Sequence, residues 1–205
     1  MKNLNNFLKK AFKAYDNKSS LAIIKKTGEK FDKSDKRLFV VAGPNGSGKT
    51  TLIANLYNLG ILDVPYINAD LFASTLYSFI TDERDRNLKS MYYTMDMVEK
   101  YINVGKSFCY ETVLSHPSKI DLIKEAKARG YNVISIFVYL TSPEKNIERV
   151  KLRTSQGGHD VPEDKIRERY IRSLKLSNEL ESISDEFYRL DNSKTLPIVN
   201  LDREK

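Results

Sequence analysis

The sequence predicts an α/β fold in which helices flank a mostly parallel β-sheet. Short apolar runs alternate along the chain with segments of helical periodicity, as in strand–helix–strand units. A glycine-rich segment follows the first apolar run, and polar residues follow later runs, at the strand ends where parallel sheets bind ligands. With 205 residues, the chain is long enough for one domain with a substantial core.

The glycine-rich segment reads Gly-Pro-Asn-Gly-Ser-Gly-Lys-Thr-Thr over residues 43–51 and matches the phosphate-binding P-loop pattern. It lies between an apolar run suited to a buried strand, residues 38–42, and a predicted helix over residues 50–59. Backbone N–H groups of such a loop point at a triphosphate, and the following helix favours negative charge at its N-terminus. Lys49 is expected to reach the β- and γ-phosphates, and the Thr50 hydroxyl to bind Mg²⁺. The segment predicts a P-loop NTPase-type fold with these nucleotide-binding residues: Gly43, Pro44, Asn45, Gly46, Ser47, Gly48, Lys49, Thr50 and Thr51.

The other elements follow from apolar spacing and from residues that start or stop helices. Residues 1–36 form a predicted N-terminal extension that is polar and rich in lysine and contains a short amphipathic helix. The main predicted domain covers residues 37–205. Gly105 and Gly130 are expected to end the helices before them. Strands are expected at residues 64–68, 107–110, 132–140 and 196–201, and helices over 82–104 and 117–129 and from Pro143 and Pro162 onward.

Two acidic residues lie at the carboxyl ends of predicted strands, on the edge of the sheet that also holds the P-loop. Asp70 could accept the proton of a substrate hydroxyl during phosphoryl transfer, or cap the next helix with its side chain. Glu111 could hold a water molecule of the Mg²⁺ shell, contact the substrate or form a structural ion pair. Thr112 could donate a hydrogen bond to either ligand.

Two helices that carry arginines are expected on either side of the glycine pair Gly157-Gly158. Ser142 and Pro143 begin the first helix, and Pro162 begins the second. Phosphoryl transfer needs positive groups on the γ-phosphate, so the pair predicts a helical lid that closes over the phosphates. A solvated basic surface is the alternative. The arginines concerned are Arg149, Arg153, Arg167, Arg169 and Arg172.

Taken together, these segments resemble the zeta toxin family of P-loop kinases, in particular its shorter branch of stand-alone predicted ATPases. The resemblance covers residues 38 to 200 approximately, with its pieces in family order. They are residues 43–51, Ile-Asn-Ala-Asp at 67–70, Glu-Thr-Val-Leu-Ser at 111–115, Arg149-Val150, residues 157–163, Arg167 to Tyr170 and Asp191-Asn192-Ser193.

The resemblance implies ATP-dependent phosphorylation of the aminosugar hydroxyl of UDP-N-acetylglucosamine, with toxicity restrained by a small, separately encoded antitoxin. Asp70 would be the base, while Glu111 and Thr112, with His159, would contact the nucleotide sugar. Arg153 and one of Arg167 or Arg169 would clamp the transferring phosphate, and Asn192 would lie near adenine. The chain has Val113 where family members typically have threonine, and losing that hydroxyl could alter the contacts with the substrate.

Other functions are weighed against the kinase. A transport ATPase of the ABC type shares the P-loop, but the sequence has neither a Leu-Ser-Gly-Gly-Gln signature nor an apolar run ending in Asp-Glu. A nucleic-acid 5′-hydroxyl kinase is compatible with the net charge of +7. A non-catalytic NTP-dependent interaction module is also possible, although it leaves the base and the lid unexplained.

Cysteine content and hydropathy predict a cytoplasmic protein without a membrane partner. Cys109 is the single cysteine and lies in an apolar run, which excludes a disulfide framework. The longest apolar runs have about eight residues, too few to span a bilayer. The N-terminus lacks the apolar segment of a signal peptide. A local basic patch is enough for a nucleotide substrate, so nucleic acid is not the expected partner.

Overall fold

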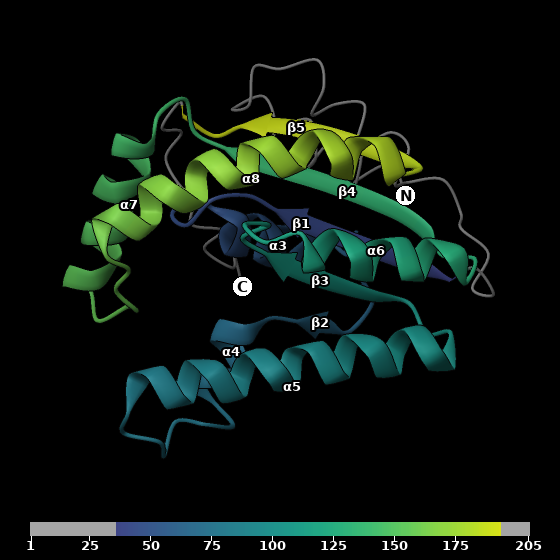
Figure 1. The fold of residues 1–205 in the computed structure, drawn as a ribbon, viewed down its shortest axis with the longest axis horizontal. Helices are drawn as coiled ribbons and strands as arrows, with labels where there is room; N and C mark the ends of the chain where they lie inside the picture. The colour runs from purple at the N-terminus through teal and green to yellow at the C-terminus, as the bar shows by residue number, and fades with distance from the viewer. Residues whose placement is uncertain (1–35, 194–205) are drawn as a thin grey trace, which may run out of the picture.

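Within residues 36–193, five strands form one sheet in the order β2-β3-β1-β4-β5, and all neighbouring strands are parallel (Figure 1). The computed structural model describes residues 36–193. The strands are β1 (Arg37–Ala42), β2 (Tyr66–Ile67), β3 (Phe108–Thr112), β4 (Asn132–Tyr139) and β5 (Glu186–Asp191). The helices are α3 (Lys49–Asn58), α4 (Ala69–Ser74), α5 (Glu83–Val104), α6 (Ser118–Ala128), α7 (Pro143–Ser155) and α8 (Glu163–Ile183). The predicted α/β class with a parallel sheet is confirmed.

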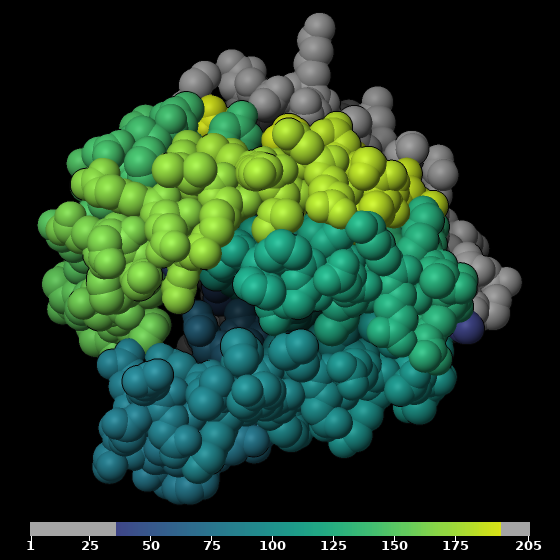
Figure 2. All heavy atoms as spheres, viewed as in Figure 1, coloured from purple at the N-terminus to yellow at the C-terminus, as the bar shows by residue number. Residues whose placement is uncertain are grey.

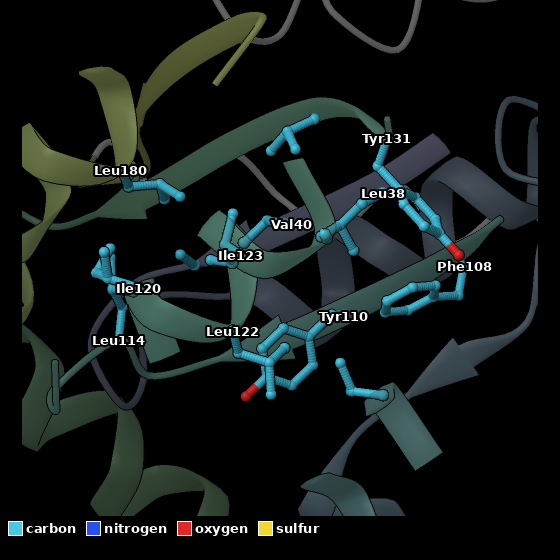
Figure 3. Packing of buried hydrophobic residues seen from close by; sticks show 14 of the residues in the cluster. Leu38, Val40, Phe108, Tyr110, Leu114, Ile120, Leu122, Ile123, Tyr131 and Leu180 are labelled. Atoms are coloured by element: carbon cyan, nitrogen blue, oxygen red, sulfur yellow. The ribbon is translucent and has the colours of Figure 1, made fainter. Parts of the chain in front are cut away.

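Side chains alternate between the two faces of the sheet, as the period of two in a strand requires. Leu38 and Val40 of β1 join the cluster that α5, α6 and α8 cover (Figure 3). Phe39 and Val41 point to the opposite face, where Ile53 and Leu56 of α3 pack against them. Both faces of the central strands are therefore buried, which explains why residues 132–140 are almost continuously apolar.

Helix ends follow the residues that the sequence analysis singled out. α5 ends at Gly105, whose φ of 68° is the left-handed conformation that glycine adopts without strain. At its start, the Asp82 carboxylate accepts a hydrogen bond from the Asp85 N–H at 2.7 Å. Ser142 precedes α7 in an extended conformation, with Pro143 at the first helical position.

Two predicted elements lie partly or wholly outside the described residues: the amphipathic helix in residues 1–36 and the strand at residues 196–201. β5, the last strand within residues 36–193, was not predicted. Its residues Glu186, Arg189 and Asp191 are charged and half-buried at the sheet edge, so it lacks the apolar pattern of a core strand. β2 is also shorter than predicted, with two residues in place of five.

The register of the strands brings the predicted site together. β1 pairs with β3 so that Val41 lies opposite Glu111 and Ala42 opposite Thr112. The P-loop therefore leaves β1 beside the end of β3, and the Gly43 N–H donates to the Thr112 carbonyl at 3.2 Å. None of the helices between residues 36 and 193 combines the length and the hydropathy that a membrane span requires.

Candidate active site

The P-loop joins β1 to α3. At Gly43 and Gly48, other atoms lie so close to the loop backbone that only glycine fits. At Gly43, a Cβ atom would lie 2.0 Å from the carbonyl oxygen of Val138. At Gly48, φ is +96° and a Cβ atom would lie 2.4 Å from Asn192 Nδ2. The Ser47 hydroxyl is fully buried and has no hydrogen-bond partner among the described residues. The loop therefore contains a buried polar atom that a bound phosphate could satisfy.

We expect Gly48→Ala to weaken ATP binding by at least about tenfold, because the new methyl group collides with Asn192 and the left-handed backbone is strained. Equilibrium titration with a fluorescent ATP analogue measures this change. Gly60→Ala is the matched control, since Gly60 has φ +66° but no atom within 4 Å of a Cβ. Equal loss of binding in both variants would contradict a specific role for the loop conformation.

Lys49 lies at the centre of the site with its side chain buried. Its Nζ donates to the Pro44 carbonyl at 2.9 Å and lies 4.0 Å from Glu111 Oε1. Burial lowers the pKa of Lys49 below its ordinary value, whereas the carboxylates of Glu111 and Asp70 act in the opposite direction. Arg153 lowers the pKa further. These charges belong to four separate segments, so the fold brings the predicted catalytic groups close enough to influence one another.

Glu111 makes the densest set of contacts in the site. Its two carboxylate oxygens lie 3.1 and 3.2 Å from the Thr50 hydroxyl, which donates to them. The Tyr66 hydroxyl donates to Glu111 Oε2. Burial, and then the Glu111 charge, raise the pKa of Tyr66 well above its usual value, so the phenol stays protonated. Contact with Thr50 favours the interpretation of Glu111 as a residue of the Mg²⁺ shell.

Asp70 lies in the first turn of α4 and does not cap that helix. The cap is Asn68, whose Oδ1 accepts from the Leu71 N–H at 2.9 Å. The alternative interpretation of Asp70 as the helix cap is therefore wrong, because the residue two positions earlier has the extended conformation that a cap requires. Asp70 is exposed, and its charge raises the pKa of Lys49 against the larger effect of burial, while its role as the base stays a prediction.

Among the five arginines of the predicted lid, the three that would clamp the transferring phosphate differ in their surroundings. Arg153 influences Lys49, and its buried Nε has no hydrogen-bond partner among the described residues. Arg169 reaches the P-loop, with Nη1 at 3.5 Å from Asn45 Oδ1. Arg167 is 46% exposed and forms ion pairs with Glu144 and Glu163. The geometry therefore favours Arg169 over Arg167 as the partner of Arg153.

Two side chains beyond the P-loop, those of Asn192 and Asn146, bond to its backbone, and Arg149 bonds to the Asn192 carbonyl. Asn192 Nδ2 donates to the Ser47 carbonyl at 2.8 Å, and the Asn192 carbonyl accepts from Arg149 Nη2 at 2.7 Å. Asn146 is fully buried in α7 and donates to the Asn45 carbonyl at 2.5 Å. The first turns of α7 are therefore bound to the P-loop, directly through Asn146 and indirectly through Arg149. The predicted contact of Asn192 with adenine stays a prediction.

Two other residues predicted to contact the substrate, Thr112 and His159, have partners within the protein. The Thr112 hydroxyl accepts from the Leu114 N–H at 3.1 Å and supports a turn in which Leu114 has φ 55°. His159 Nδ1 lies 2.9 Å from Glu83 Oε1, so the loop after α7 contacts the start of α5. Figure 2 shows the molecular surface hollowed between α7–α8 and the α4–α5 region. Roles of Thr112 and His159 in substrate binding stay predictions.

Sequence reasoning missed Tyr66 and Asn146. Tyr66 precedes Asn68 by two residues in a strand, so alternation places both on one face and could have indicated a polar pair. Asn146 lies beside Ile147 and one turn before Val150, which made it a polar residue on the apolar side of an amphipathic helix. A buried amide in such a position needs a partner, and the P-loop backbone supplies it.

The residues present fit a nucleotide bound with Mg²⁺. Within residues 36–193, no three His, Cys, Asp or Glu side chains gather into a group that could hold a metal by themselves. Mg²⁺ would instead take oxygen ligands from the Thr50 hydroxyl, nucleotide phosphates and water, which is its usual environment in such sites. Ser47 Oγ and Arg153 Nε are the buried polar atoms that phosphate oxygens could satisfy.

Sequence comparison gives a family match over most of the chain. A model of the family described as Zeta toxin matches residues 22–205, which include all the described residues and part of the predicted extension. An uncharacterized protein of Haemophilus influenzae is 29% identical over 128 residues, which cover 62% of this chain and 88% of that protein.

Structural comparison finds the same fold in other proteins. A candidate kinase from Chloroflexus aurantiacus has a TM-score of 0.54 at 18% identity, covering 77% of this chain and 88% of that chain. A structure from the PezAT chromosomal toxin–antitoxin system of Streptococcus pneumoniae has a TM-score of 0.58 at 16% identity, covering 89% and 78%. The AvrRxo1-ORF1:-ORF2 complex with ATP has a TM-score of 0.55 at 20% identity, covering 72% and 50%. At these identities, the likeness shows the fold alone.

Proposed function

The chain belongs to the zeta toxin family, and from this premise we propose that it transfers the γ-phosphate of ATP to a sugar hydroxyl of a UDP-N-acetylglucosamine-like nucleotide sugar. Membership supports a kinase-like P-loop phosphotransferase. The observation that carries the proposal is the buried Lys49 of the P-loop beside Glu111, with the charges of Asp70 and Arg153 near enough to act on its pKa. A phosphate-binding loop alone would need neither the exposed carboxylate of Asp70 nor the nearby arginine.

The P-loop side of the site would bind and orient the triphosphate. Loop N–H groups, the Ser47 hydroxyl and the N-terminus of α3 would contact phosphate oxygens. Lys49 would exchange the Pro44 carbonyl for phosphate oxygens, which relieves the cost of burying its charge. Mg²⁺, when bound, neutralises charge on the phosphates as the transferring group leaves. Glu111 would hold the Thr50 hydroxyl and water on that side of the site.

The acceptor side of the site would be formed by Asp70 and the segment around it. Asp70 is exposed at the start of α4 and its charge acts on Lys49, so its carboxylate would face an acceptor bound beside the P-loop. There it would accept the proton of the attacking hydroxyl, which is the role of a base in phosphoryl transfer. Thr112 and His159 would complete the acceptor site after giving up their present partners.

Substituting Arg167 and Arg169 one at a time shows which of them contacts the transferring phosphate. We expect Arg169→Ala to lower kcat about 100-fold, because a charge aimed at the transferring phosphate is lost. Arg167→Ala should change kcat less than about threefold, because an exposed ion pair contributes little. Steady-state transfer from γ-labelled ATP measures both. The reverse order of effects would place Arg167 at the phosphate and contradict this assignment.

The distribution of charge favours a small acceptor over nucleic acid. Residues 36–193 contain 22 Lys and Arg against 21 Asp and Glu, so the described part of the chain is almost neutral. Residues 1–35 contain nine lysines against four acidic residues and carry most of the net charge of +7. A nucleic-acid kinase would need basic groups along the path of the phosphate backbone. The nucleotide sugar is therefore the proposed acceptor, and the 5′-hydroxyl of an oligonucleotide is the alternative.

We also propose a small, separately encoded antitoxin as a partner, and residues 37–205 as the catalytic domain behind an extension of residues 1–36. Support comes from the family and from the toxin–antitoxin system among the structural neighbours. Co-expression with proteins encoded next to the gene, followed by co-purification, tests the partner. Purification of the chain alone from every such pair would contradict it.

An acceptor panel tests the proposed reaction. Full-length protein is incubated with γ-labelled ATP and Mg²⁺ and with UDP-N-acetylglucosamine, a nucleoside or a 5′-hydroxyl oligonucleotide. Label on the nucleotide sugar is the expected result. Label on the nucleoside or the oligonucleotide alone would overturn the nucleotide-sugar acceptor, and the absence of label on all three would overturn the kinase proposal for these substrate classes.

A further inference from the structure

Tyr66 lies between the acceptor side and the phosphate side of the site, in the strand just before α4. In β2 it pairs with Cys109 of β3, and the alternation of side chains puts it on the same face as Glu111, two residues farther along β3. The Tyr66 side chain is long enough to reach that position, and its hydroxyl donates to Glu111 Oε2. The contact joins two strands that run side by side to the same edge of the sheet (Figure 1).

The segment that carries Asp70 directly follows Tyr66 in the chain. Asn68 lies two residues after Tyr66 in the chain. Asn68 is 6% exposed, and its Oδ1 caps α4 through the Leu71 N–H. Asp70 follows in the first turn of that helix, so its position depends on the cap.

On the other side, Glu111 connects Tyr66 to the P-loop. Its carboxylate accepts from the Thr50 hydroxyl and lies 4.0 Å from Lys49 Nζ. Without the phenol, one carboxylate oxygen would lose its short contact and Glu111 could rotate away from Thr50. A neutral donor is well suited to this role, because it fixes the carboxylate without cancelling its charge.

We propose that Tyr66 is a positioning residue that holds the Glu111 carboxylate beside Thr50 for phosphoryl transfer. The proposal rests on the proposed kinase function and deepens it. Among the described residues, the Tyr66 hydroxyl donates to Glu111 and not to a P-loop group, so it acts through that carboxylate. A displacement of reacting groups by a fraction of an ångström lowers the rate of transfer more than the binding of ATP.

Tyr57 provides a matched control for Tyr66. The two rings lie 6.4 Å apart, and burial raises the pKa of both phenols. The Tyr57 hydroxyl, however, donates to the backbone carbonyl of Val64 and has no contact with Glu111. Tyr57→Phe and Tyr66→Phe therefore each remove one partly buried hydroxyl from the same region, and only the second removes the link.

The first measurement needs no acceptor. The rise in the unfolding midpoint caused by ADP is recorded with MgCl₂ and with EDTA for the wild type and both variants. For the wild type and Tyr57→Phe, we expect a larger rise with Mg²⁺. For Tyr66→Phe, the rise in EDTA should be unchanged and most of the Mg²⁺ increment lost, because Glu111 no longer stays beside Thr50. An equal Mg²⁺ increment in all three proteins, or none in the wild type, would overturn the proposal.

The second measurement separates the effect on kcat from the effect on KM. Tyr66→Phe should lower kcat about tenfold or more and raise the KM for ATP with Mg²⁺ by a smaller factor, whereas Tyr57→Phe should change neither by more than about threefold. Equal kcat values in the two variants would overturn the positioning role. Failure of the wild type to phosphorylate any acceptor would overturn the proposed function, and the Mg²⁺ increment would still decide the role of Tyr66.

Discussion

Replacing Asp70 with asparagine is expected to lower kcat for phosphoryl transfer by about 1,000- to 10,000-fold, the upper part of the range for loss of a general base. The amide has nearly the same shape but does not accept the proton of the acceptor hydroxyl. α4 should remain intact, because its cap is Asn68 and not Asp70. ATP binding should stay within about threefold of the wild type, since the loss affects only the transition state.

Single-turnover transfer from γ-labelled ATP, together with ATP titration, measures both quantities for Asp70→Asn. Asp63→Asn is the matched control, because Asp63 is an exposed carboxylate that precedes β2 by three residues, as Asp70 follows it by three. We expect the control to retain wild-type kcat. Transfer at the wild-type rate in Asp70→Asn would remove Asp70 as the base.

Replacing Lys49 with methionine is expected to reduce kcat by about 1,000-fold, because the positive group next to the transferring phosphate is lost. The free energy of unfolding of the nucleotide-free protein, by contrast, should not fall. Burial lowers the Lys49 pKa, which means that the folded protein without nucleotide disfavours its charged form despite Glu111 and Asp70. An apolar side chain of similar length should therefore leave the nucleotide-free protein at least as stable as the wild type.

Thermal unfolding without nucleotide and steady-state transfer test the Lys49→Met variant on the same preparation. Lys100→Met serves as the control for loss of a lysine, since Lys100 is exposed and pairs with Asp96 on α5. A Lys49→Met protein that is unfolded would show that the ammonium group is needed for the fold. A folded variant with near-wild-type transfer would contradict its role at the phosphate.

Much of the fold could be predicted because local and long-range signals agree. In three places, residue type and position in the sequence indicate the same structure. They are the P-loop, the apolar strand of residues 132–140 and the glycine that ends α5. β5 could not be predicted in this way. It is held by pairing with β4 at the sheet edge, so backbone hydrogen bonds stabilise a sequence whose own pattern is weak.

The candidate site shows a similar division. Residues next to strand ends, such as Asp70 and Glu111, could be predicted because parallel strands bring those ends together. Which of Arg167 and Arg169 faces the P-loop could not, because both lie on α8 and differ only in helix rotation. Tyr66 was missed for a different reason: its hydroxyl contacts Glu111 across two strands, and only the register reveals it.

The measurement that tests the central proposal most directly is the mass of UDP-N-acetylglucosamine after incubation with the full-length protein, ATP and Mg²⁺. We predict a gain of one phosphoryl group per sugar nucleotide, with matching consumption of ATP, in the wild type and a much slower gain in Asp70→Asn. Wild-type protein that binds ATP but leaves the mass of the nucleotide sugar unchanged would contradict the proposed acceptor.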